Sequence, residues 1–213
     1  MKREGFFITL EGGDGSGKTT VLGRVAAYLQ NHSMPYLITR EPGGVDIAEK
    51  IRSIILDPAH TAMDARTEAL LYAAARSQHL AEVVEPALQE GITVLCDRFV
   101  DSSLVYQGYA RGLGIEEVWG INRFATGGRM PDLTFYLDVD PEVGLSRIAA
   151  NQGREVNRLD LENLEFHQKV QAGYKLVVDS DPQRIVVLDA GRPIHMVEQD
   201  IVSVLKDRIL KDF

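Results

Sequence analysis

The chain has 213 residues, of which 45% are hydrophobic and 25% charged, and this composition predicts a soluble globular protein with a core of ordinary size. Its formal net charge of −8 argues against a nucleic acid or an anionic membrane as a partner, because such partners require a basic surface. The single cysteine, Cys96, excludes an internal disulfide framework, and no segment is apolar enough for a signal peptide or a membrane span. We therefore predict a cytoplasmic protein that forms a single domain over residues 1–213.

A glycine-rich segment, EGGDGSGKTT at residues 11–20, follows the first predicted strand, residues 6–10. Apolar residues at helical spacing come next, so the glycines lie on a strand-to-helix turn and the pattern GxxxxGKT predicts a phosphate-binding loop, or P-loop. In such a loop backbone N–H groups surround a polyphosphate, Lys18 reaches the β- and γ-phosphate oxygens, and the Thr19 hydroxyl is placed for Mg²⁺. The candidate ATP-binding residues of the loop are Gly12, Gly13, Asp14, Gly15, Ser16, Gly17, Lys18, Thr19 and Thr20.

Four further strand-like runs, residues 36–39, 92–96, 133–138 and 184–188, alternate with helical patterns. This alternation predicts a three-layer α/β fold of the P-loop NTPase type, with a five-stranded parallel sheet flanked by helices. Ligands in such sheets bind at the carboxyl ends of the strands, so the polar residues that follow each strand are candidates for the site.

Arginines follow the second predicted strand. Arg40 ends it and Arg52 lies on the next helix, and both are candidates for an anion site at the sheet edge. A surface salt bridge with Glu41 or Glu49 is the alternative for either arginine. We expect four isoleucines of this helix to face inward, namely Ile47, Ile51, Ile54 and Ile55.

Residues 63–88 predict one long helical region, interrupted or restarted near Pro86. Its expected apolar face includes Leu70. Tyr72 and Arg76 are four residues apart, which places them on the same face of that helix.

The third predicted strand ends at Asp97, next to Arg98. An acid at the end of a buried strand beside a phosphate loop can hold Mg²⁺ directly or through water, although a buried Asp–Arg pair is the alternative. Further along, a hydroxyl, an amide and a guanidinium recur at four-residue spacing, which is unusual for a core stripe: Ser103, Gln107 and Arg111.

Two later segments complete the candidate site. Residues 147–160 form a polar stretch with Arg154 and Arg158, which suits a lid that closes over a polyphosphate and excludes water. Arg192 follows the fifth strand, on the ligand side of the sheet.

Taken in order, six segments resemble the bacterial thymidylate kinase family, which phosphorylates dTMP with ATP, and the resemblance runs almost end to end. They are EGGDGSGKTT at 11–20, REPGG at 40–44, LLYAAARSQH at 70–79, DRFVDSSLVYQGYARG at 97–112, PDLTFYLDVDPE at 131–142 and REVNRLDLENLEFHQKVQAGY at 154–174. The resemblance implies ATP and dTMP as substrates, Mg²⁺ as the cofactor and a homodimer.

The resemblance also implies residue roles. Arg40, Arg52 and Arg98 match the arginines that hold the dTMP phosphate, within reach of Pro42, and Asp14 matches an acid near the acceptor sugar and the metal. Tyr72 stands where the family more often has a phenylalanine that stacks on thymine. The residues that match those at the polar edge of the base are Arg76, Ser103 and Gln107. Tyr106 matches the tyrosine that disfavours a ribose. Since the P-loop has no arginine, the resemblance implies that Arg154 and Arg158 reach ATP and act in catalysis together with Lys18, Arg98 and Asp97. It also implies that Thr19 and Asp97 bind the metal and that Arg192 lies at the ATP site.

Two other classes remain as alternatives. Another nucleotide or nucleoside kinase of the same fold is the nearer one, since fold alone does not set the acceptor. A regulatory P-loop NTPase is less favoured, because the chain has no Asn-Lys-x-Asp guanine motif and carries Gly13 where partitioning-type ATPases have a second lysine.

Overall fold

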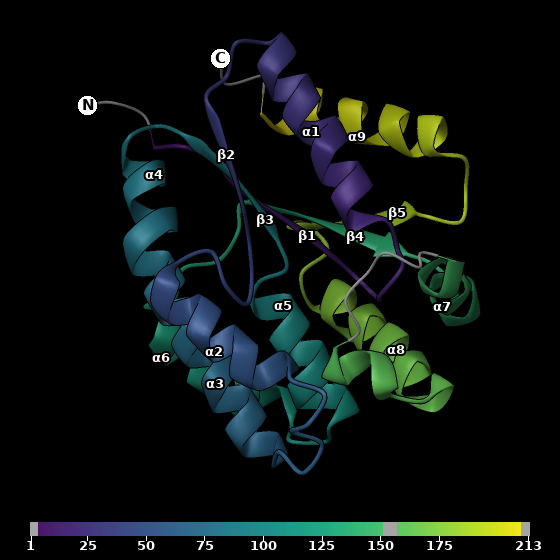
Figure 1. Cartoon of the computed structure of the whole chain (residues 1–213). Helices are drawn as coiled ribbons and strands as arrows, with labels where there is room; N and C mark the ends of the chain where they lie inside the picture. The colour runs from purple at the N-terminus through teal and green to yellow at the C-terminus, as the bar shows by residue number, and fades with distance from the viewer. Residues whose placement is uncertain (1–3, 151–156, 210–213) are drawn as a thin grey trace.

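A five-stranded, all-parallel sheet forms the centre of the protein in this computed structural model, which describes residues 4–150 and 157–209 (Figure 1). The strand order is β2-β3-β1-β4-β5, so the P-loop strand is central. Each predicted strand is confirmed, with ends that differ by at most two residues. The strands are β1 (Phe7–Gly12), β2 (Tyr36–Arg40), β3 (Thr93–Asp97), β4 (Leu133–Asp138) and β5 (Ile185–Asp189).

Helices connect successive strands, as parallel pairing requires. They are α1 (Lys18–Asn31), α2 (Asp46–Leu56), α3 (Ala65–His79), α4 (Glu85–Gln89), α5 (Val100–Ser103), α6 (Ile115–Thr126), α7 (Pro141–Ala150), α8 (Leu164–Ser180) and α9 (Ile194–Arg208), with π-helical turns at Leu80–Val84 and Leu104–Ala110 and a 3₁₀ turn at Arg158–Leu161.

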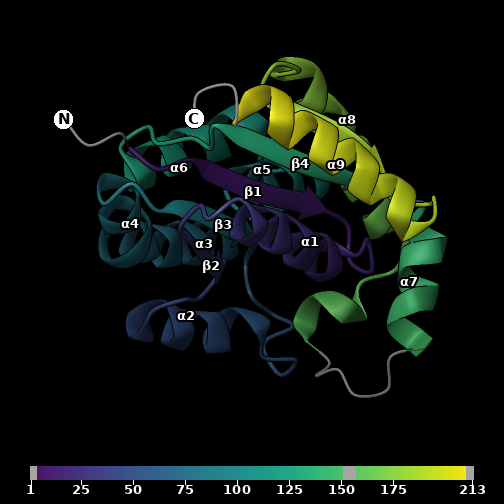
Figure 2. The same ribbon diagram turned by 90° about the horizontal axis from the view of Figure 1, so that it is seen from above.

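Two apolar clusters fill the two faces of the sheet. Ile8, Leu10 and Leu95 point to the face that α1 and α9 cover, whereas Phe7 and Val94 point to the face covered by α4, α8 and the π-helical turns. This alternation follows from the two-residue period of a strand. Figure 2 shows α1 and α9 in front of the strands and α3 to α6 behind them, which is the predicted three-layer α/β arrangement.

The long helical region predicted over residues 63–88 is interrupted as expected. Leu80–Val84 takes a π-helical turn, and Pro86 lies in the first turn of α4. Proline has no N–H to donate within a helix, but the first turn of a helix leaves its N–H groups without intrahelical partners, so the restart accommodates Pro86.

The prediction that four isoleucines of α2 face inward is wrong for two of them. Ile47 and Ile54 are 49% and 45% exposed, while Ile55 is fully buried. Helix α2 packs on α3 rather than directly on the sheet, so only a narrow stripe of it is covered. Leu70, expected on the apolar face of α3, is also exposed, at 55%.

The register of the strands assembles the polar residues that end them. Asp97 lies opposite Leu10 of β1 and Arg40 of β2, so the P-loop strand, the acid and the arginine meet at one edge. Among the described residues, no helix combines the length and the apolar character that a membrane span requires.

Candidate active site

The glycine-rich loop makes a tight turn between β1 and α1. Gly15 and Gly17 have φ angles of 73° and 94°, in the left-handed region that favours glycine, and α1 begins at Lys18. A Cβ on Gly15 would lie 2.1 Å from the carbonyl oxygen of Gly144 in α7. The loop therefore needs glycine both for its backbone conformation and for its close approach to α7.

Lys18 points into the loop and is buried, with 8% of its surface exposed. Its ammonium donates to the carbonyl oxygens of Gly12 at 3.1 Å and Gly13 at 3.0 Å. Burial, together with the nearby Arg98, lowers the pKa of Lys18 to about 8, against the opposing charges of Asp97 and Asp14. The side chain is thus a cation held in place before any anion binds.

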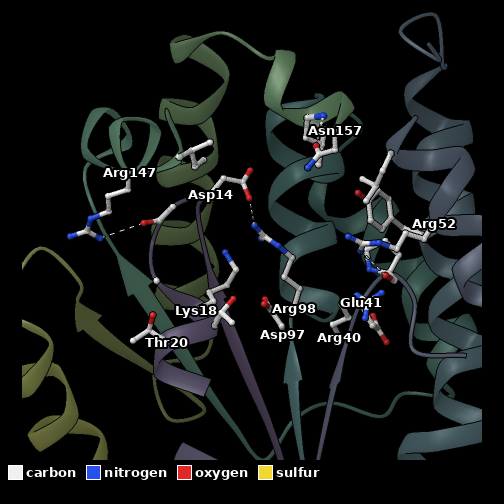
Figure 3. Close-up of a pocket in the computed structure, with 18 residues that line it drawn as sticks. Asp14, Lys18, Thr20, Arg40, Glu41, Arg52, Asp97, Arg98, Arg147 and Asn157 are labelled. Carbon is white, nitrogen blue, oxygen red and sulfur yellow. Dashed lines mark hydrogen bonds and ion pairs between the residues drawn. The ribbon is translucent and has the colours of Figure 1, made fainter. Parts of the chain in front are cut away.

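A cavity of about 580 Å³ opens beside this loop and is lined by charged residues from several elements (Figure 3). Its walls come from the P-loop, the end of β2, α2, α3, the end of β3, α7 and the segment before the 3₁₀ turn. Among the lining residues are Asp14, Gly15, Gly17, Lys18, Thr19, Thr20, Arg40, Pro42, Arg52, Tyr72, Asp97, Arg98, Arg147 and Asn157.

Arg98 occupies the middle of this cavity wall. Its Nη2 donates to Asp14 Oδ1 at 2.8 Å, its Nη1 donates to Ser102 Oγ at 3.1 Å, and its guanidinium lies 5.1 Å from the ring centroid of Tyr106. The backbone φ of Arg98 is 71°, a conformation that is strained for a residue with a Cβ. Strain of this kind persists only where the surroundings hold it, so the fold fixes this guanidinium between the P-loop and the adjoining pocket.

Arg40 and Arg52 lie across the cavity, where the end of β2 meets α2. Arg40 pairs with Glu49 at 2.8 Å, which is the surface salt bridge considered above, and both groups are largely exposed. Arg52 donates to the carbonyl oxygen of Pro42 at 2.8 Å, and its burial near Arg40 lowers its pKa. Because an exposed ion pair is worth little, Arg40 can leave Glu49 for an anionic ligand at small cost.

A smaller pocket continues from the cavity and shares Glu41, Tyr72, Arg98 and Leu159 with it. The residues predicted to contact the base or the sugar all line this pocket, so the structure brings together side chains from α3, α5 and the π-helical turn that follows. These residues are Tyr72, Arg76, Ser103, Tyr106 and Gln107.

Arg76 is the most constrained residue of the smaller pocket, at 2% exposure. It donates to Glu41 Oε2 at 2.7 Å, to Ser103 Oγ at 3.0 Å, to the Phe99 carbonyl oxygen at 2.9 Å and to Asn122 Oδ1. Four of its five N–H groups are therefore bonded within the protein, and Arg76 is part of the core as well as of the pocket.

Arg76→Ala is expected to lower the free energy of unfolding by about 3–5 kcal/mol, because it leaves the buried Glu41 carboxylate without its cation. Denaturant unfolding measures this change. The matched control is Arg24→Ala, which breaks an exposed pair with Glu198 at 3.5 Å and should change stability by less than about 1 kcal/mol. Equal effects in the two variants would contradict the structural role of Arg76.

Three predicted ATP-site arginines have different outcomes. Arg158 is 5% exposed and does not line the cavity; it donates to the carbonyl oxygen of Ile55 at 2.9 Å and pairs with Glu68. Arg192 pairs with Asp189 and Asp200, away from the cavity lining. Arg154 lies outside the described residues. By contrast Arg147 of α7 donates to the carbonyl oxygens of Gly15 at 3.4 Å and Ala190 at 3.1 Å and lines the cavity.

Two buried acids that the sequence reasoning left without a role organise the site. Glu11 is fully buried and accepts from Phe99 N at 2.7 Å, Ser102 Oγ at 2.5 Å and Tyr174 Oη at 2.8 Å, so it ties the P-loop strand to the turn that carries Arg98. Burial, with Asp101 nearby, raises the pKa of Glu11 to about 7. Glu41 accepts from Arg76 and lies 2.9 Å from His79 Nδ1. The sequence feature that could have pointed to Glu11 and Glu41 is that each acid lies at or directly after the end of a strand.

Comparisons with known proteins agree with this geometry. The family model described as "Thymidylate kinase" matches residues 10–201. The chain is 58% identical over 208 residues to a thymidylate kinase of Bacillus pumilus, covering 98% of both chains. It is 57% identical to that of Clostridium novyi over 203 residues, with 95% of this chain and 99% of the relative covered, and 56% identical to that of Geobacillus thermodenitrificans, with 96% and 91% covered. The chain therefore belongs to the thymidylate kinase family.

Proposed function

We propose that this protein transfers the γ-phosphate of ATP to the phosphate of dTMP, giving dTDP and ADP, as a step of dTTP biosynthesis. The observation that carries the proposal is the position of Arg98, whose guanidinium contacts Asp14 of the P-loop on one side and lines the base pocket on the other. A residue so placed can neutralise charge where two phosphate chains meet.

The acceptor side matches a thymidine monophosphate in its chemistry. Arg40, Arg52 and Arg98 offer three guanidinium groups for one phosphate, and Pro42 lines the same cavity and accepts a hydrogen bond from Arg52. Tyr72 offers a ring face for the base, Arg76, Ser103 and Gln107 offer polar groups for its edge, and Tyr106 closes the pocket where the sugar would lie. These roles remain proposals drawn from the family resemblance and supported by the shared lining.

The reaction needs alignment more than proton transfer. The second pKa of a phosphate monoester is about 6, so the attacking oxygen is already ionised at neutral pH and no general base is required. The obstacle is repulsion between two anions, and Lys18 with the arginines offsets it while charge shifts through a loose transition state. Arg147 donates a hydrogen bond to the carbonyl oxygen of Gly15 in the P-loop, so it is a candidate for contacting the phosphates of ATP. The role of Arg154 and Arg158 at ATP, in a lid of about residues 147–160, stays a prediction.

The two residues predicted from the sequence to bind Mg²⁺, Thr19 and Asp97, have suitable chemistry and position. Asp97 Oδ1 is buried without a hydrogen-bond partner, and Asp97 and Thr19 both line the cavity beside Lys18. Within the described ranges no three His, Cys, Asp or Glu side chains cluster as a metal site, and Mg²⁺ in phosphoryl-transfer enzymes typically uses one or two carboxylates together with phosphate oxygens. We infer that Thr19 and Asp97 would hold the ion, which neutralises charge on the β- and γ-phosphates.

Lys18 gives the ATP affinity a predicted pH dependence. With its pKa lowered to about 8, the free protein loses the Lys18 proton as pH rises through 8, whereas bound ATP favours the charged form. The kcat/KM for ATP is therefore expected to fall above about pH 8, and ATP binding at that pH should take up a proton, visible as buffer-dependent heat in calorimetry. A profile that stays flat to pH 10 would contradict this prediction.

Acceptor choice is tested by a coupled ADP-release assay with dTMP, dUMP, dCMP, dGMP and AMP. The proposal expects dTMP to have the highest kcat/KM. Turnover that is absent or equal across the series would instead favour another nucleotide kinase of the same fold, or a regulatory P-loop NTPase if ATP is hydrolysed without an acceptor.

We propose that two copies of the chain associate through α2, α3 and α6. In the protein, α2 packs against α3, and α3 packs against α6. Several large apolar side chains on these helices are exposed: Phe124 of α6 at 93%, Leu70 of α3 at 55%, and Ile47 and Ile54 of α2. Covering apolar surface of this kind is what drives association. The cytoplasmic location and the single-domain organisation remain predictions.

Phe124→Glu is expected to convert a dimer into a monomer, because a charge would have to be buried in the contact. Sedimentation at micromolar protein measures the mass. The control, Leu176→Glu, places the same charge on the 47% exposed Leu176 of α8 and should leave the dimer intact. A wild-type protein that sediments as a monomer would refute the association.

A further inference from the structure

Glu68 is a buried acid that has no proposed part in binding ATP, dTMP or Mg²⁺. It lies on α3 one turn before Tyr72 and two turns before Arg76, so all three share a helix face. Its side chain is 1% exposed and accepts hydrogen bonds from three residues on two segments of the chain. Gln107 and Arg111 lie in and directly after the second π-helical turn, and Arg158 lies in the 3₁₀ turn.

The hydrogen bond between Gln107 and Glu68 determines which end of the Gln107 amide faces Glu68. Gln107 Nε2 donates to Glu68 Oε1 at 2.8 Å, and both side chains are buried. An ionised carboxylate can only accept, so the NH₂ end of the Gln107 amide must face Glu68 and its Oε1 must face elsewhere. No described residue donates to Gln107 Oε1, and Gln107 lines the smaller pocket, so the free acceptor is available there.

Two arginines hold the Glu68 carboxylate from the other side. Arg158 pairs with its Oε2 while also donating to the Ile55 carbonyl oxygen, and Arg111 Nη2 lies 3.4 Å from the same oxygen. Arg111 is itself fixed by Glu162 at 2.6 Å and by the ring of Phe166. These two arginines fix the position of the Glu68 carboxylate, so the direction of its hydrogen bond to Gln107 is fixed as well.

We propose that Glu68 is a positioning residue for base selection: it orients the Gln107 carboxamide so that an acceptor oxygen faces the base. Thymine and uracil carry an N–H at ring position N3, which this oxygen accepts, whereas cytosine presents an unprotonated acceptor nitrogen there. Two facing acceptors leave both groups unsatisfied in a buried site, which is the strongest way to reject a near-isostere. The proposal rests on the proposed function, since it assumes a pyrimidine monophosphate in this pocket.

The first test is Glu68→Gln, assayed with dTMP and dCMP. An amide at position 68 can donate or accept, so Gln107 can take either orientation. The ratio of kcat/KM for dTMP to that for dCMP is expected to fall roughly tenfold to a hundredfold, mainly through a higher KM for dTMP, with the KM for ATP unchanged. The control is Glu162→Gln, which removes the other carboxylate on Arg111 without touching Gln107 and should leave the ratio unchanged.

A double-mutant cycle separates positioning from simple loss of structure. If Glu68 acts through Gln107, Glu68→Gln should not change the ratio further in a Gln107→Met background, whereas a general disturbance of the pocket would lower it in both backgrounds. Thermal unfolding of each variant accompanies the kinetics.

The exchange Glu68→Gln with Gln107→Glu keeps the net charge and reverses the hydrogen bond, so it serves even if Glu68→Gln alone does not fold. A carboxylate at position 107 presents only acceptors, and selectivity for dTMP over dCMP is expected to be retained. Loss of selectivity in the exchange, or an unchanged ratio in Glu68→Gln, overturns the inference. A wild-type protein that does not use dTMP refutes the proposed function itself, which is a distinct result.

Discussion

Lys18→Ala is expected to lower kcat by roughly a thousandfold, because it removes the cation that the loop holds at the phosphates. Cooperative unfolding should persist. The hydrogen bonds of Lys18 go to the carbonyl oxygens of Gly12 and Gly13, and Lys18 itself lines the open cavity, so water can replace each bond at a cost of about 1 kcal/mol. The coupled ADP-release assay measures kcat, and denaturant unfolding measures stability.

Lys169→Ala is the matched control for this experiment. Lys169 is 52% exposed and pairs with Glu165 within α8, so its removal should change neither kcat nor the unfolding midpoint by much. Near-normal turnover in Lys18→Ala, or a loss of cooperative unfolding, would contradict the role given to the loop lysine.

Arg98→Ala is expected to reduce kcat by roughly 10³–10⁵, the range seen when an arginine that stabilises phosphoryl transfer is removed. Arg98 is the described arginine that contacts the P-loop acid and also lines the base pocket, so kcat/KM should fall for dTMP and for ATP together. Steady-state kinetics with each substrate varied in turn distinguishes this from a loss of affinity on one side.

Arg98→Lys is the informative partner variant. It keeps the positive charge but loses the fork that reaches Asp14 and Ser102 together, and we expect an intermediate rate. Arg129→Ala controls for removal of a paired arginine elsewhere, since Arg129 is paired with Glu85 and Glu4 outside the site. A rate for Arg98→Ala that matches Arg129→Ala would rule out a catalytic role for Arg98.

Much of the fold follows from patterns that span a few residues. Each buried strand is a short apolar run, and the P-loop is a continuous segment whose glycines have local reasons, so both were predictable from sequence. The cavity also gathers most of the predicted ligand residues, because parallel strands bring their carboxyl ends to one edge.

Errors arose where the answer depended on a neighbour far away in sequence. Ile47 and Ile54 follow a helical apolar pattern, yet they are exposed because α2 packs on α3 rather than on the sheet. The pairing of the Arg158 guanidinium with Glu68, 90 residues earlier in the chain, was likewise not visible in the sequence, while the role of Arg158 at ATP stays a prediction. The spacing of apolar residues shows which residues lie on the same face of a helix, but it does not show which element packs against that face.

The sequence by itself determined the parallel α/β architecture, the phosphate-binding loop and the family, since each rests on contiguous residues of defined chemistry. Only the tertiary structure decided which charged side chains are buried as structural pairs and which remain open to a ligand. Glu11 and Glu68 belong to the first group, and Lys18, Arg52 and Arg98 to the second. Glu41 belongs to both, because it is buried against Arg76 and also lines the cavity. The physical reason is that burying a charge is costly unless a partner is within hydrogen-bond reach, and here the partners come from other elements of the fold.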